Sequence, residues 1–129
     1  MTSSSNAPPH SVSDLPILQK IADAYIIWHK NLGNLERITR YTLAEKIDKL
    51  FLDTIEYILL AGYSPREHKA AIVDKASTKL DALKFFLRLM NSTKELKDNK
   101  YLEISQPLLE VGKQLGGWKK QVGENLEGR

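Results

Sequence analysis

The sequence from Leu108 to Lys120 decides the fold, and it reads LLEVGKQLGGWKK. Its apolar or small residues recur at steps of three and four and form one stripe of a helix: Leu108, Val111 or Gly112, Leu115 and Trp118. Gly116 and Gly117 each cost such a helix about 1 kcal/mol relative to alanine, so their presence needs a reason. Either the helix ends at these glycines and Trp118 folds back on its own bundle, or the glycines allow close approach of another subunit.

The same helical spacing continues along almost the whole chain, and no segment shows the strict alternation of a strand. Helices are expected near residues 14–32, from 36 or 39 to 61, over 65–91 and from 98 to 122. Four helices of this length with short connections predict an all-α fold, an antiparallel up-down-up-down four-helix bundle.

The repeat also predicts which side chains are buried and where the helices are interrupted. Ser64-Pro65-Arg66-Glu67 is typical of a capping box with proline at the first helical position. Pro107, inside the fourth helix, predicts a kink. The residues expected on the buried stripes are Leu18, Ile21, Ala22, Tyr25, Trp28, Leu32, Leu43, Ile47, Leu50, Phe51, Thr54, Ile55, Ile58, Leu59, Ile72 or Val73, Ala76, Leu80, Leu83, Leu87, Met90, Tyr101, Leu102 and Ile104.

Length and composition bound the organisation of the chain. Its 129 residues suit one domain, which we place at residues 14–122, between a disordered tail (1–13) and a frayed tail (123–129). The first tail has no lysine, arginine or apolar run, so it is not a secretory signal, and no segment is long and apolar enough to span a membrane. The chain contains no cysteine, which suits a cytoplasmic protein.

Residues for catalysis or metal binding are not arranged in a recognisable pattern. His10, His29 and His68 have no partners at the spacing of metal ligands. The serines and threonines of the helices fall on polar faces or helix ends, and no glycine-rich phosphate loop is present. We therefore expect neither an enzyme nor a bound metal or cofactor.

The distribution of charge is more informative. Residues 64–93 hold 6 basic and 3 acidic residues and account for the net charge of +3. Two pairs of cations lie one helical turn apart, and three further lysines extend the set: Lys75 with Lys79, Lys84 with Arg88, and Lys113, Lys119 and Lys120. Such a surface fits phosphate or an acidic partner, with Arg88 the best candidate for a bidentate contact. Alternatively, carboxylates such as those of Asp74 and Asp81 neutralise the cations locally.

In four segments the chain resembles the accessory variability determinant (Avd) family of diversity-generating retroelements. They are Leu15-Pro16-Ile17-Leu18-Gln19-Lys20, Ala61-Gly62-Tyr63-Ser64, the pattern Lys79-Leu80-x-x-Leu83-x-x-x-Leu87-Arg88-Leu89, and residues 108–118. The resemblance covers about Leu15 to Val122. It implies a homopentameric barrel of four-helix bundles that is not itself catalytic. It also implies a basic surface that binds template RNA or DNA and a partner reverse transcriptase during mutagenic retrohoming.

Carried over to this sequence, the resemblance places Lys79, Lys84 and Arg88 on the basic surface. It places four residues of the fourth helix in packing or in the subunit interface: Gly112, Gly116, Gly117 and Trp118. The family is also related to the four-helix proteins of ribosomal RNA intervening sequences. The alternative hypothesis is therefore a structural or protein-interaction bundle of that type, without nucleic-acid binding.

Overall fold

The computed structural model describes the backbone of residues 15–127 and the side chains of residues 15–123. The expected tail at residues 1–13 lies outside this part of the chain, as do the last two residues. Four long helices form the described fold: α1 (Pro16–Asn31), α3 (Leu43–Tyr63), α4 (Arg66–Ser92) and α5 (Asp98–Glu127). A 3-10 turn, η2 (Leu32–Asn34), and a short helix, α2 (Arg37–Arg40), connect α1 to α3. Residues 15–127 contain no strand, which confirms the all-α fold class.

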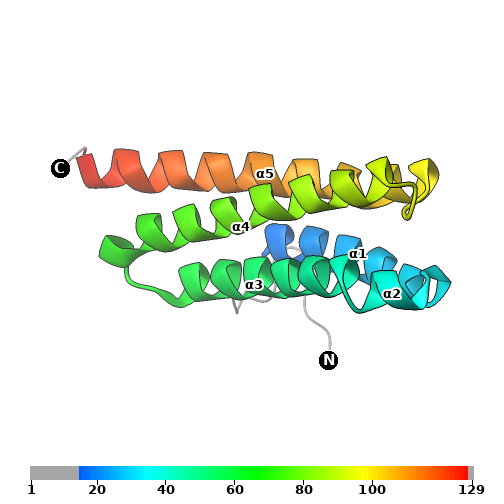
Figure 1. The fold of residues 1–129 in the computed structure, drawn as a ribbon. Helices are drawn as coiled ribbons and strands as arrows, with labels where there is room; N and C mark the ends of the chain where they lie inside the picture. The colour runs from blue at the N-terminus through cyan, green and yellow to red at the C-terminus, as the bar shows by residue number, and fades with distance from the viewer. Residues whose placement is uncertain (1–14, 128–129) are drawn as a thin grey trace, which may run out of the picture.

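The helices lie side by side along a shared apolar core (Figure 1). α4 packs against both α3 and α5, whereas α1 packs mainly on α5 and less extensively on α3. Most of the predicted stripes are buried, with two corrections. Ala22 and Leu102 are exposed; Ala24, which was not on the predicted stripe, is buried, and Ile104 is buried as predicted. Each neighbouring residue on a helix is rotated by about 100°, so a stripe drawn slightly too wide includes exposed positions.

A partly buried polar contact joins α1 to α3. Tyr25 Oη and Trp28 Nε1 both donate to Asp48 Oδ1, at 2.9 Å and 3.2 Å. Phe51 packs against both aromatic rings. Burial, with the hydrogen bond and charge of Asp48, raises the pKa of Tyr25 to about 12. The carboxylate therefore satisfies the polar groups of two aromatic side chains where these helices meet.

The second predicted helix is interrupted near its start. α2 ends at Arg40, Tyr41 and Thr42 form a turn, and α3 begins at Leu43. The Thr39 side chain is buried and its hydroxyl donates to Glu95 in the α4–α5 connection. This long-range hydrogen bond accompanies the separation of α2 from α3, and local sequence could not predict it.

The turn between α3 and α4 differs from the predicted capping box. Pro65 is the N-cap of α4, with no side-chain cap, and helical geometry starts at Arg66. The Ser64 hydroxyl instead donates back to the Leu60 carbonyl, at 2.6 Å. Lys69 Nζ donates to the Ala61 carbonyl at 2.7 Å, so both side chains serve the C-terminus of α3.

α5 is continuous through Pro107 and through the glycine pair (Figure 1). The missing N–H of Pro107 leaves the carbonyl four residues earlier without its helical donor. That carbonyl belongs to Glu103, an exposed residue, so water can take the place of the donor. α5 also continues to Glu127, beyond Val122, where the sequence predicted a frayed tail. No helix within residues 15–127 combines the length and apolar character needed to cross a bilayer.

Candidate nucleic-acid interface

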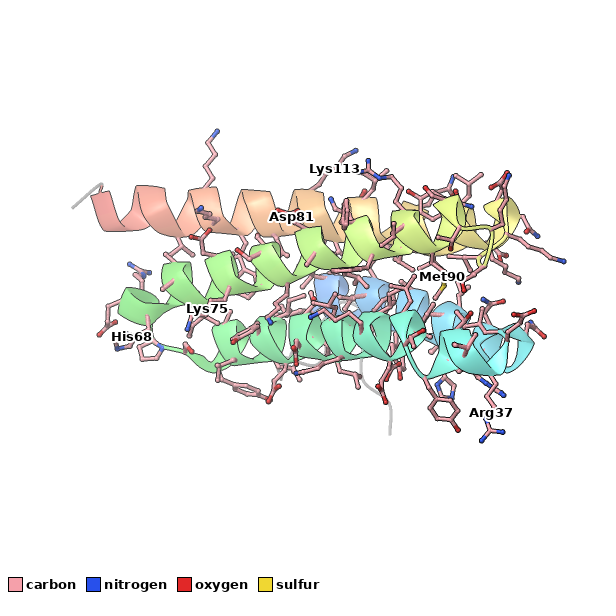
Figure 2. The ribbon with its side chains drawn as sticks, in the orientation of Figure 1. Arg37, His68, Lys75, Asp81, Met90 and Lys113 are labelled. Carbon is pink, nitrogen blue, oxygen red and sulfur yellow. The ribbon has the colours of Figure 1, made fainter. Side chains whose placement is uncertain are left out.

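The cations of α4 lie on two different sides of that helix. Lys75 and Lys79 face α3: Lys75 Nζ lies 6.0 Å from the ring centroid of Tyr57, and Lys79 Nζ lies 3.6 Å from Asp53 Oδ2. Figure 2 shows Lys75 on the α3 side of α4. Lys84 faces α5, because its Nζ lies 3.6 Å from the position that a β-carbon would take at Gly112. The two predicted pairs therefore do not form a single row.

Several of the candidate cations are matched by carboxylates. Lys119 Nζ lies 2.6 Å from Asp74 Oδ1, and Lys84 Nζ lies 4.0 Å from Asp81 Oδ1. Asp53 accepts from Lys49 at 3.1 Å in addition to its contact with Lys79. The Lys84–Asp81 and Lys119–Asp74 pairs are exposed and contribute at most about 1 kcal/mol each, so an approaching phosphate can compete for these two lysines.

The other four candidates have no ion-pair partner within the described residues: Lys75, Arg88, Lys113 and Lys120. Lys113 points away from the bundle on α5 (Figure 2), and Lys120 is also exposed on that helix. Arg88 is exposed on α4, where its Cζ lies 5.7 Å from the ring centroid of Phe85. The expected bidentate contact of Arg88 is not made to a carboxylate within residues 15–123. Its guanidinium remains accessible to solvent.

The glycines and Trp118 of α5 have different surroundings. Trp118 is half-buried against the core and lies under Lys69, whose Nζ is 5.7 Å from its ring centroid. Trp118 therefore folds onto its own bundle, although the helix does not end at Gly116. A β-carbon at Gly112 would make ordinary contacts with Leu80 and Lys84, both at 3.6 Å. A β-carbon at Gly116 or Gly117 would meet nothing within 4 Å.

A family model described as bAvd-like matches residues 15–122, most of the chain. The chain belongs to the bAvd-like family. This membership confirms the resemblance found in the four sequence segments. Avd-like proteins are a family of accessory helical bundles. Comparisons with curated proteins and with solved structures gave no match.

The bAvd-like chain carries a further basic group that sequence reasoning missed. Arg37 and Arg40 lie on α2, and neither has an ion-pair partner in the described part of the chain. Tyr41 follows them and is 66% exposed, with Arg37 Cζ 6.0 Å from its ring centroid. The spacing Arg37-x-x-Arg40-Tyr41 in the sequence could have indicated this basic group. It was overlooked because the segment was assigned to the first turn of a longer helix.

Histidine, aspartate and glutamate side chains are candidates for metal binding, and their arrangement can be followed over the described residues of this bAvd-like chain. Across residues 15–123, no three His, Asp or Glu side chains come together in an arrangement that could hold a metal ion. His29 lies beside Tyr25, with ring centroids 5.8 Å apart, and His68 is exposed in the first turn of α4 (Figure 2).

Proposed function

We propose that this chain is a non-catalytic accessory protein of a diversity-generating retroelement. In this role it binds template RNA or DNA and the partner reverse transcriptase, supports mutagenic retrohoming, and acts in the cytoplasm. Family membership supports the accessory role. The observation that carries nucleic-acid binding is the exposed pair Arg88 and Lys113, on adjacent helices α4 and α5, without carboxylate partners among the described residues.

The α4–α5 basic surface consists of Lys84, Arg88, Lys113, Lys119 and Lys120. Two of these lysines have exposed acidic neighbours, which keeps the surface only moderately positive. Lysine and arginine contacts to phosphates release counterions but do not read bases. We therefore expect binding that weakens with salt and depends little on sequence.

The same proposal includes self-association into a homopentameric barrel of up-down-up-down bundles. The connections support the bundle topology, because α3 and α4 pack together although only Ser64 and Pro65 separate them. The open space beside Gly116 and Gly117 supports the subunit contact. A helix that keeps two exposed glycines in its interior gains from them when another backbone lies close.

The experiment that tests nucleic-acid binding compares two double variants with the same net charge. Arg88→Glu with Lys113→Glu alters the α4–α5 basic surface, whereas Lys30→Glu with Arg66→Glu alters exposed cations of α1 and of the start of α4 that have no ion-pair partner among the described residues. We expect the first variant to weaken binding of a labelled RNA by about tenfold or more, since it loses two phosphate contacts and adds two repulsive charges. The control should stay within about twofold of the wild type, a difference set by net charge alone.

Equal affinities of the two double variants would contradict this proposal and favour the intervening-sequence alternative. The ion pairs of Lys84 and Lys119 are the observation that favours that alternative, because they neutralise part of the α4–α5 basic surface. Circular dichroism of each variant verifies that helicity is unchanged.

A further inference from the structure

Two exposed aromatic rings each lie beside an arginine near the same end of the bundle. We propose that these two pairs, Arg37 with Tyr41 and Arg88 with Phe85, are stacking platforms for unpaired nucleotides. The nucleic acid preferred by this chain is then single-stranded. This inference rests on the proposed function and specifies its substrate class.

The position of the first pair, Arg37 with Tyr41, is fixed by a hydrogen bond from α2. Thr39 is 1% exposed, and its hydroxyl donates to Glu95 Oε2 at 2.5 Å. The other carboxylate oxygen of Glu95 accepts from the Thr93 hydroxyl at 2.8 Å. With Thr39 anchored, α2 presents its remaining side chains outward, and Figure 2 shows Arg37 pointing away from the bundle. The Tyr41 ring next to it is 66% exposed.

The second platform is braced by a neighbouring ring. Phe85 is 51% exposed and makes an edge contact with Phe86, with ring centroids 5.5 Å apart and an interplanar angle of 83°. Lys46 Nζ, from the first turn of α3, lies 5.9 Å from the Phe86 centroid. Arg88 Cζ lies 5.7 Å from the Phe85 centroid. An exposed ring is thus fixed between a second ring and a guanidinium.

Contacts between elements bring the platforms to one end of the molecule. Thr39 ties α2 to the connection that follows α4, and Lys46 ties the start of α3 to the turn of α4 that carries Phe85 and Phe86. Figure 1 shows α2 beside the end of the bundle where α4 joins α5. Both platforms therefore lie toward the same end of the bundle.

The chemistry of these pairs discriminates between strand types. Unstacked bases bind on aromatic faces and on planar guanidinium groups, whereas bases inside a duplex are stacked on one another and offer no free face. Neither arginine has an ion-pair partner in residues 15–123, so each can also bind the phosphate next to a stacked base. Every base has a π face, so the preference concerns strandedness and not sequence.

The test is fluorescence anisotropy of the full chain with a labelled oligouridylate, an oligothymidylate and a duplex of matched length. Tyr41→Ala with Phe85→Ala should weaken binding of both single strands by about tenfold or more, given the usual effect of removing stacked aromatics. Binding of the duplex should change by less than about twofold, because its phosphate contacts remain. Comparing the uridylate with the thymidylate distinguishes RNA from DNA.

Two controls separate stacking from fold and charge. Tyr63→Ala removes a tyrosine that is 67% exposed at the far end of α3, and it should leave all three affinities unchanged. Tyr41→Phe with Phe85→Trp keeps both rings and should retain single-strand binding. An equal loss for single strands and duplex, or no loss for either, overturns the inference. If Arg88→Glu with Lys113→Glu abolishes binding while the alanine variant does not, only the stacking inference fails. If the wild type binds none of the three oligonucleotides, the proposed function fails as well.

Discussion

The Lys79 amine lies 3.6 Å from the Asp53 carboxylate and links the middle of α4 to α3. The Asp53 side chain is only 20% exposed, so removal of its partners leaves a partly desolvated charge. Lys79 is therefore occupied within the fold, although its spacing from Lys75 suggested a free phosphate contact.

Lys79→Glu is expected to lower the free energy of unfolding by about 1 kcal/mol, because it replaces attraction to Asp53 with repulsion. Lys113→Glu, at an exposed position without an ion pair in the described residues, should change it by less than about 0.5 kcal/mol. Urea denaturation followed by circular dichroism measures both values. Equal destabilisation by the two substitutions would show that the Asp53 contact has no energetic importance.

Replacing either glycine of the α5 pair should stabilise the single chain but weaken its self-association. Gly116→Ala and Gly117→Ala should each raise the free energy of unfolding of the diluted chain by about 1 kcal/mol, because the added methyl group meets nothing within 4 Å. The same substitutions should reduce the mass measured by light scattering if a second subunit lies close to this helix.

Gly33→Ala is the control for the glycine experiment, since Gly33 also has open space but lies outside α5. Its mass should equal that of the wild type. A stabilised Gly116→Ala variant with unchanged mass would remove this part of α5 from the subunit contact. A wild-type mass near 14.7 kDa, that of one chain, would rule out the pentamer.

The half-buried Asp48 carboxylate is expected to be important for stability. Asp48→Ala leaves the Trp28 indole N–H, in a side chain that is 0% exposed, without its acceptor. A buried donor without a partner costs about 1–3 kcal/mol, and we expect a loss of that size in urea denaturation. Tyr25→Phe removes one donor and leaves the carboxylate bonded to Trp28, so it should be milder. An Asp48→Ala variant as stable as the wild type would contradict this role.

The raised pKa of Tyr25 predicts a specific dependence of stability on pH. The unfolded chain releases the Tyr25 proton near pH 10, whereas the folded chain retains it until about pH 12. The contribution of this group to stability is complete below pH 10 and is lost as pH rises through the window to 12. The difference in unfolding free energy between wild type and Tyr25→Phe should shrink from about pH 9 to about pH 11. A constant difference would contradict the shift.

Much of the fold could be predicted because helical periodicity is a local property. Ile21, Phe51, Leu80 and Leu108 are buried as their spacing predicts. The division of the second helix could not be predicted, because the hydrogen bond from Thr39 to Glu95 connects residues 56 positions apart.

The sequence indicated the candidate cations but not which of them share a face of the folded protein. Spacing along α4 pairs Lys75 with Lys79 and Lys84 with Arg88, but only the packed neighbours decide that the first pair faces α3 and that Lys84 faces α5. One interpretation packs Trp118 on its own bundle, and the Trp118 side chain lies half-buried against that core. That interpretation placed the end of the helix wrongly, because α5 tolerates two glycines in its interior.

The most direct test of the central claim is the affinity of the wild-type chain for template RNA over a series of salt concentrations. Binding through the α4–α5 basic surface predicts a linear fall of log affinity with log salt, of slope about −0.7 for each phosphate contacted on a single strand. Arg88→Glu with Lys113→Glu should reduce the magnitude of that slope by about 1 to 2. A slope that is the same in both proteins, or an affinity that does not respond to salt, would contradict the account.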